Sequence, residues 1–187
     1  MELPRRAAIE MQQLGSMVIR PATEEDLNAV LGIYNAAIEN TTAVFEYRPH
    51  SIDARREWFA NKRAGGWPVI VAVDRDVVIG FASYGPFRGW PAYKYSVEHS
   101  VYVAESSRRQ GVGEALLRAV VDDARARGFH TMIGGVTSDN TASLKLHRKV
   151  GFVDAGAVRQ SGYKFGRWLD LVFVQIVFDT PSDPKDG

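Results

Sequence analysis

Residues 67–85, with the sequence WPVIVAVDRDVVIGFASYG, constrain the fold of this chain more than any other stretch. They hold two apolar runs separated by Asp74-Arg75-Asp76, which is the pattern of a β-hairpin with buried strands. Further strand-like runs lie at 95–104 and 130–137, each followed by a helix-like segment, and two more end the chain. Antiparallel hairpin strands followed by βαβ units indicate a mixed sheet with helices on both faces.

Four segments have the apolar spacing and the end signals of helices. The first follows Thr23, which forms an approximate capping box with Asp26. The other three begin near Ser51, Gly111 and Asn140. The predicted order is β-α-α-β-β-β-α-β-α-β-β, which places the chain in the α/β (α+β) class as a single domain.

Composition excludes several classes of protein. Lys plus Arg number 23 and Asp plus Glu 22, so the basic excess of a nucleic-acid-binding protein is missing. The chain has no cysteine, which excludes disulfides, cysteine-ligated zinc and a cysteine nucleophile and fits a reducing compartment. No run approaches the ~20 apolar residues that cross a bilayer. We therefore expect a cytoplasmic protein with no membrane or nucleic-acid partner.

Both ends of the chain are polar. Residues 1–16 contain no apolar run long enough for a secretory signal. Because the first strand-like run starts only at Met17, we expect 1–16 to be a loosely attached leader, with Met17 as a candidate natural start. The folded domain is expected over 17–179, and 180–187 has the composition of a frayed tail.

Residues 106–117, SSRRQGVGEALL, place Gly111 and Gly113 at the start of the third predicted helix, behind Arg108 and Arg109. A helix N-terminus stabilises anions, glycine lets an anion approach the backbone, and arginine suits phosphate oxygens. A plain strand-to-helix turn with solvated arginines explains the same residues equally well. The segment is neither a P-loop nor a dinucleotide fingerprint, because it lacks Gly-Lys-Ser/Thr and a third glycine.

Two signatures together favour a phosphorylated ligand. Residues 108–113 (RRQGVG) resemble the R/Q-x-x-G-x-G/A motif of the GCN5-related N-acetyltransferases (GNAT), and residues 140–152 (NTASLKLHRKVGF) resemble the second motif of that family. The resemblance covers about 18–178 and implies the GNAT fold and acetyl-CoA as acetyl donor. It assigns the pyrophosphate to Arg108, Arg109, Gln110, Gly111, Val112 and Gly113, and the pantetheine or acetyl end to Val101, Tyr102, Val103, Asn140 and Ser143.

His147 stands where many family members place a tyrosine that protonates the departing thiolate. With the segments NTTAVFE, VEHSVYV, LHRKVGF and KFGRWLDL, it makes the chain similar to the phosphinothricin and methionine sulfoximine/sulfone N-acetyltransferases. That resemblance implies a cytoplasmic, generally homodimeric enzyme that acetylates the α-amino group of a small amino acid by direct transfer. It also implies that His147 is a proton donor or a water-mediated base.

Glu98 is the candidate general base, which a protonated amine needs before it can attack. Strand alternation places Glu98 and Tyr102 on the face opposite His99. The strand alone slightly favours a solvated or arginine-paired carboxylate, whereas the matching glutamate of the subfamily has the base role. For Asn140, a helix N-cap is a sufficient structural reason.

An amino-acid acceptor also needs a cation for its carboxylate. The loop GPFRGWPAY offers Arg88 beside Gly89 and Trp90, and the matching segment of the subfamily binds substrate. Arg167 or Lys164 could take the place of Arg88.

Phe45 and Tyr93 are candidate walls of a substrate pocket, although aromatic residues in loops are more often simple packing. The four histidines lack the spacing of metal ligands, and no metal is expected.

Two other interpretations stay open. An acetyltransferase of the same fold could act on a polyamine, an aminoglycoside or a protein N-terminus, for which an acidic pocket would be expected in place of Arg88. A non-catalytic acyl-CoA-binding sensor could keep the phosphate loop, and it would not need Glu98.

Overall fold

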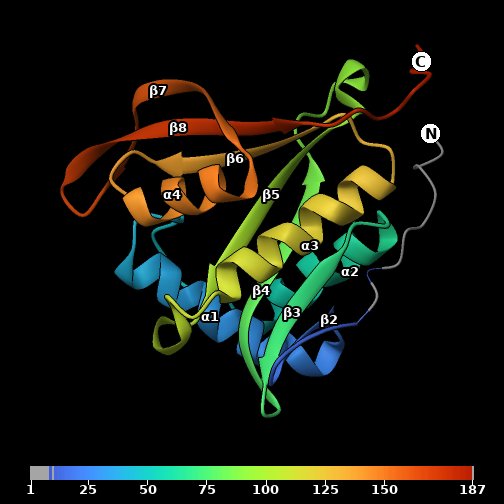
Figure 1. Ribbon diagram of the computed structural model, residues 1–187. Helices are drawn as coiled ribbons and strands as arrows, with labels where there is room; N and C mark the ends of the chain where they lie inside the picture. The colour runs from blue at the N-terminus through green and yellow to red at the C-terminus, as the bar shows by residue number, and fades with distance from the viewer. Residues whose placement is uncertain (1–8, 10, 187) are drawn as a thin grey trace.

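Helices cover both faces of one mixed sheet in the computed structural model, which describes residue 9 and residues 11–186 (Figure 1). The strands are β1 (Gln12–Leu14), β2 (Met17–Pro21), β3 (Val69–Asp74), β4 (Val77–Pro86), β5 (Ser96–Val103), β6 (Thr131–Thr137), β7 (Val153–Lys164) and β8 (Arg167–Val177). The helices are α1 (Leu27–Asn40), α2 (Ile52–Ala64), α3 (Val112–Ala126) and α4 (Thr141–Val150), with short 3-10 turns at Glu24–Asp26, Pro91–Tyr93 and Glu105–Ser107.

The eight strands follow the order β1-β2-β3-β4-β5-β6-β8-β7. Among the described strands, β5 and β6 form the one parallel pair, and all other neighbours are antiparallel. The predicted mixed, mostly antiparallel sheet with helices on both faces is therefore confirmed.

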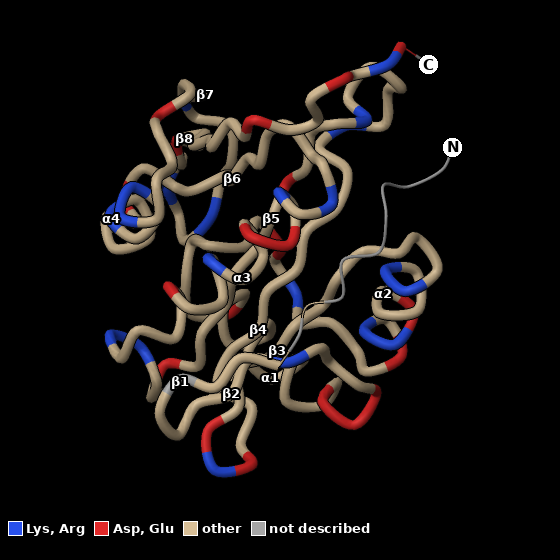
Figure 2. Tube along the Cα trace, turned by 45° about the vertical axis from the view of Figure 1, so that its right-hand side comes forward, with Lys and Arg blue, Asp and Glu red and all other residues tan. Residues whose placement is uncertain are grey.

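The predicted hairpin joins β3 to β4, which lie between β2 and β5 in the sheet. Its two loop residues, Arg75 and Asp76, have φ angles of 47° and 66°. Two consecutive left-handed residues form a type I′ turn, whose twist matches that of the flanking strands. The hairpin tip projects into solvent, as the acidic and basic colours at the end of β3 show in Figure 2.

Local capping signals fix where the helices begin. The Asp26 carboxylate accepts a hydrogen bond from the Thr23 amide at 2.8 Å, and the Ser51 hydroxyl accepts one from the Ala54 amide at 3.2 Å. Gly151 ends α4 in the left-handed conformation with φ of 107°, which a residue with a Cβ would adopt only with strain. The helix starts predicted at Thr23, Ser51 and Asn140 are confirmed within a few residues.

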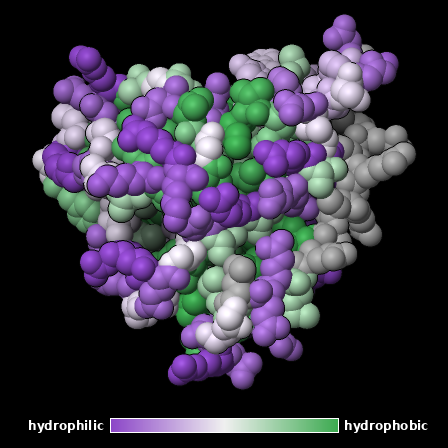
Figure 3. Space-filling view, viewed as in Figure 1, coloured by the Kyte–Doolittle hydropathy of each residue, from purple (hydrophilic) through white to green (hydrophobic). Residues whose placement is uncertain are grey.

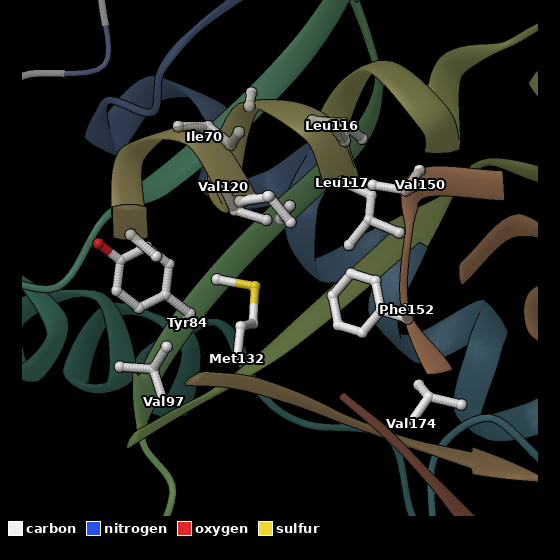
Figure 4. Close-up of a cluster of buried hydrophobic side chains, with 14 of the residues drawn as sticks. Ile70, Tyr84, Val97, Leu116, Leu117, Val120, Met132, Val150, Phe152 and Val174 are labelled. Carbon is white, nitrogen blue, oxygen red and sulfur yellow. The ribbon is translucent and has the colours of Figure 1, made fainter. Parts of the chain in front are cut away.

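The main core lies between the sheet and the layer of α3 and α4. Figure 4 shows its central residues, which are Ile70, Tyr84, Val97, Leu116, Leu117, Val120, Met132, Val150, Phe152 and Val174. On the other face, α1 and α2 cover the sheet through Val30 and Phe59, among others. Each fully buried aliphatic or aromatic side chain contributes roughly 1.5–3 kcal/mol to folding, so both helix layers are held by the sheet rather than by helix propensity.

The structure differs from the sequence prediction near the N-terminus. Gln12–Leu14 forms a short strand that pairs with β2, within the segment expected to be a loose leader. The open edge of β2 provides hydrogen-bond partners for these backbone groups, although their sequence has no strand pattern. Residues 1–8 and 10 of that segment lie outside the described residues.

Lys and Arg positions alternate with Asp and Glu positions along the described trace (Figure 2). In the face shown in Figure 3, polar side chains form most of the surface, and hydrophobic ones appear in small groups between them. No helix in the described part of the chain is long and apolar enough to cross a membrane.

Candidate active site

The strands β5 and β6 diverge after a short parallel pairing. They pair only over Ser96–Glu98, whereas β5 stays paired with β4 as far as Val103. The Tyr95 carbonyl accepts a hydrogen bond from the amide of Thr131, the first residue of β6, at 3.2 Å, so the backbone groups of odd-numbered residues face β6. The N–H and C=O groups of Val101 and Val103 therefore line a strand edge that β6 does not cover.

Tyr102 differs from its neighbours in this respect. Its backbone lies opposite Phe81 of β4, and its ring packs edge-on against Tyr34 with centroids 5.3 Å apart. The open edge therefore belongs to Val101 and Val103, whereas the backbone of Tyr102 faces β4, and the contact of Tyr102 with a cofactor stays a prediction.

The N-terminus of α3 presents free amides beside this edge. The first hydrogen bond that closes a helical turn runs from the Ala115 amide to the Gly111 carbonyl at 3.0 Å. The amides of Val112 and Gly113 precede that turn and have no partner within the helix. Gly111 has φ of 84°, a left-handed conformation that turns the chain into the helix without a side chain in the way. Such a helix end is suited to bind an anion.

Gly113 and Arg108 bring the helix end and the strand edge together. A Cβ on Gly113 would lie 3.2 Å from a methyl group of Leu146, so the absence of a side chain lets α3 approach α4 closely. The Arg108 guanidinium donates to the Val103 carbonyl at 3.5 Å. Arg109 and Gln110 are exposed beside it. The residues predicted from the first signature therefore lie at one end of the open strand edge.

Glu98 occupies the last position at which β5 pairs with β6. Its side chain is half-buried, and Oε1 lies 3.6 Å from the point where a Cβ on Gly135 would be. Burial raises the pKa of the Glu98 carboxyl, and the nearby positive charge of Arg88 partly opposes the rise. A carboxylate in this position can accept a proton closer to neutral pH than an exposed glutamate can.

Two consecutive glycines of β6 make room for side chains on the two faces of the sheet. A Cβ on Gly134 would lie 2.8 Å from Nε2 of His99 and 3.2 Å from Nε2 of His147. A Cβ on Gly135 would instead meet Leu171 at 3.3 Å and the Glu98 carboxyl. The glycine pair therefore serves the histidines on one face and the candidate base on the other.

His147 forms a buried pair with His99. The Nε2 atoms of the two rings are 3.2 Å apart, and the rings are stacked with centroids separated by 5.0 Å. Nδ1 of His147 lies 2.7 Å from the Ser143 carbonyl, which can only accept, so this nitrogen carries the hydrogen. His99 then donates from Nε2 to the bare Nε2 of His147, and its own Nδ1 has no partner among the described residues.

Burial keeps this pair neutral. It lowers the pKa of His147, and burial together with the neighbouring His147 lowers the pKa of His99 to about 3. A neutral His147 with its hydrogen on Nδ1 has none of its own on Nε2 to donate.

Asn140 has the N-cap role expected from its position. Its Oδ1 accepts from the Ser143 amide at 3.1 Å, and Ser143 in turn orients His147 through its carbonyl. Asn140, Ser143 and His147 therefore form one connected row along α4.

The loop between β4 and β5 carries the residues predicted to bind substrate. Arg88 is exposed; its guanidinium lies 4.1 Å from the centroid of the Phe87 ring and donates to the Phe87 carbonyl at 3.0 Å. Gly89 and Trp90 are also exposed. Of these three residues, Arg88 is the one whose charge lowers the pKa of Glu98.

The structure argues against the two alternative cations. Lys164 is buried, and its ammonium donates to the carbonyls of Ile38 (2.6 Å), Thr41 (2.9 Å) and Val44 (2.7 Å). All three of its hydrogens are thus used inside the protein. Arg167 forms an ion pair with Asp139.

The two candidate pocket aromatics are partly exposed. Phe45 packs on Gly162 of β7, and Tyr93 packs edge-on against Phe87 with centroids 5.7 Å apart. Among the described residues, no group of three or more His, Cys, Asp or Glu side chains could hold a metal ion.

Known proteins are similar to this chain in sequence and in fold. The sequence profile of the Acetyltransferase (GNAT) family matches residues 30–152. The chain belongs to the GNAT family of acetyltransferases. It is 44% identical over 171 residues to the L-methionine sulfoximine/L-methionine sulfone acetyltransferase of Pseudomonas aeruginosa, which covers 90% of this chain and 99% of that protein.

Two further relatives are similar over nearly the whole chain. The L-amino acid N-acyltransferase MnaT of Escherichia coli is 41% identical over 168 residues, covering 90% of this chain and 98% of that one. The crystal structure of a GNAT superfamily phosphinothricin acetyltransferase from Sinorhizobium meliloti in complex with acetyl-CoA superposes with a TM-score of 0.87. It is 34% identical and covers 92% of this chain and 95% of that chain.

The protein is thus an acetyl-CoA-dependent N-acetyltransferase, and its site fits this donor. The open edge of β5 offers backbone donors and acceptors to an amide-containing arm. The free amides at Gly111–Gly113 and the flanking arginines suit a pyrophosphate. Acetyl-CoA supplies an activated acetyl group as a thioester.

Sequence reasoning missed the His99 partner of His147 and the purpose of the two glycines. The sequence indicates only a sheet face for His99, because its contact with His147 spans 48 positions of the chain. The Gly134-Gly135 pair inside an apolar strand was the available signal, since glycine there often marks a close approach of other groups.

Proposed function

We propose that this GNAT enzyme transfers the acetyl group of acetyl-CoA to the α-amino group of methionine sulfoximine, methionine sulfone or phosphinothricin. The observation that carries the proposal is the position of Glu98, a half-buried carboxylate at the point where β5 separates from β6. A base placed there stands between the open strand edge and the face of the sheet that α1 and α2 cover. The names of the relatives support the acceptor class.

Each part of the site receives a role in this proposal. The amides of Val101 and Val103 bind the pantetheine arm and polarise the thioester carbonyl, as donors aimed at a developing oxyanion do. The α3 N-terminus binds the pyrophosphate through Arg108, Arg109, Gln110, Gly111, Val112 and Gly113. Asn140 and Ser143 hold the acetyl end from α4.

Glu98 removes a proton from the acceptor's ammonium group. Its raised pKa supports this role, because a base works best when its pKa approaches the working pH. For His147 we keep both roles, proton donor and water-mediated base, and either role requires Nε2 to exchange its hydrogen bond with His99 for one with water or with the reacting groups. Arg88, with Gly89 and Trp90, contacts the anionic end of the acceptor.

We also propose that the enzyme is a cytoplasmic homodimer. The edge strand β7 is exposed along almost its whole length, and with β8 it presents Val158, Tyr163, Phe165 and Trp168 to solvent. Exposed aromatic side chains next to an open strand edge favour contact with a second copy. The absence of cysteine is compatible with the reducing cytoplasm.

Release of CoA thiol, measured with a panel of acceptors, tests the acceptor assignment. We expect turnover with methionine sulfone, methionine sulfoximine or phosphinothricin at a kcat/KM at least about tenfold above that of spermidine or an aminoglycoside. No thiol release with the three amino acids, or a preference for the cationic amines, would overturn the proposal.

A further inference from the structure

Lys62, near the end of α2, has an ammonium group without a carboxylate partner among the described residues. Nζ donates to the Tyr84 carbonyl at 2.9 Å and lies 6.0 Å from the centroid of a Trp58 ring. None of the ion pairs formed by the described residues includes Lys62. An ammonium group has three hydrogens, so two remain for another ligand.

The ammonium group lies on the same face of the sheet as Glu98. A Cβ on Gly85 of β4 would be 2.9 Å from Nζ, so Lys62 occupies the space above this glycine. Gly85 lies directly opposite Glu98 in the antiparallel pairing of β4 and β5. Side chains at directly opposite positions project to the same face, about 5 Å apart.

The spacing between the two charged groups suits an amino acid. Lys62 lies over β4, whereas the Glu98 carboxyl extends toward Gly135 of β6, and β6 is the second strand from β4 in the sheet. Strands are ~4.8 Å apart, which gives a separation of roughly 9–10 Å. An α-amino acid spans ~3 Å from its nitrogen to a carboxylate oxygen. Two hydrogen bonds of ~2.8 Å, one at each end, bring the total to roughly 8.6 Å.

We propose that Lys62 binds the α-carboxylate of the acceptor while Glu98 faces its amino group. This inference rests on the proposed function and identifies a specificity residue that sequence reasoning did not find. Burial lowers the pKa of Lys62 to about 8, so the group is still largely cationic at neutral pH. Lys62 thus takes the carboxylate contact that the proposed function gives to Arg88, and Arg88 stays a second cation at the exposed end of the site.

The test compares methionine sulfone with its primary carboxamide, in which the carboxylate is replaced by a neutral group. Lys62→Met keeps most of the side-chain stem and removes the charge, and Lys62→Arg keeps the charge. Arg56→Met, at an exposed position of the same helix, is the control for general effects on α2. Each protein is assayed by thiol release with both acceptors and with varied acetyl-CoA.

Loss of the charge is expected to remove the preference for the carboxylate. In Lys62→Met, the ratio of kcat/KM for the acid to that for the amide should fall at least about tenfold, with KM for acetyl-CoA unchanged. Lys62→Arg should keep most of this preference for the acid over the amide, and Arg56→Met should keep all of it. Lys62→Met with an unchanged ratio would overturn the inference, whether both rates fall together or neither changes. If the wild-type protein uses neither acceptor, the proposed function fails instead.

Discussion

Replacing each glycine of the β6 pair by alanine tests the packing on the two faces of the sheet separately. In Gly134→Ala, the new methyl group would lie 2.8 Å and 3.2 Å from two imidazole nitrogens. Both rings are buried and packed against Phe152, so they cannot move away freely. Overpacking of this kind costs about 1–3 kcal/mol. Alanine in a strand recovers about 0.5–1 kcal/mol relative to glycine, which leaves a net loss of up to about 2.5 kcal/mol, with a central value of about 1 kcal/mol.

Gly135→Ala is the matched control, one position along the same strand. Its methyl group would meet a terminal methyl of Leu171 at 3.3 Å, which can shift, and the Glu98 carboxyl at 3.6 Å. We expect its free energy of unfolding to stay within about 1 kcal/mol of wild type.

Urea denaturation of the three proteins measures the difference directly. The expected order of midpoints places Gly134→Ala clearly below the other two at an unchanged m-value. Equal loss in both variants, or no loss in Gly134→Ala, would contradict the view that β6 lacks side chains there to accommodate the histidine pair.

Two further predictions concern groups buried beside the site. Burial lowers the pKa of His99 to about 3, whereas the unfolded chain titrates near 6.5 and binds the extra proton between these values. The free energy of unfolding should therefore fall as the pH drops from 6.5 towards 3, by up to about 1.4 kcal/mol per pH unit. If the unfolding free energy of a His99→Phe variant depends on pH as steeply as that of wild type, the assignment is disproved. Lys164→Met leaves the carbonyls of Ile38, Thr41 and Val44 without their donor and should lower the free energy of unfolding by about 2–4 kcal/mol. A midpoint equal to that of wild type in thermal unfolding would count against this anchoring role.

The fold was largely predictable because its signals are local. The hairpin turn at Asp74-Arg75-Asp76, the capping residue Ser51 and the stop at Gly151 each act within a few positions of the chain. The strand Gln12–Leu14 was not predictable, because its three residues have no strand pattern and pair only where β2 leaves an edge open.

The site was predictable where it follows a motif and not where it depends on packing. Strand alternation gives the sheet face of Glu98 and helix punctuation gives the turn at Gly111, whereas the base role of Glu98 depends on the family resemblance. The His99–His147 contact and the position of Lys62 over Gly85 depend on which helix covers which face of the sheet. The sequence makes Lys164 a candidate substrate cation, because charge alone does not reveal that three carbonyls already surround it.

The central claim is that Glu98 acts as the base beside acetyl-CoA bound at the open edge of β5. Glu98→Gln keeps the shape of the side chain and removes its basicity, so steady-state thiol release combined with calorimetric titration of CoA separates catalysis from binding. We predict that kcat falls at least about a hundredfold while the Kd for CoA stays within about twofold. A kcat close to that of wild type, or a parallel loss of CoA affinity, would contradict the account.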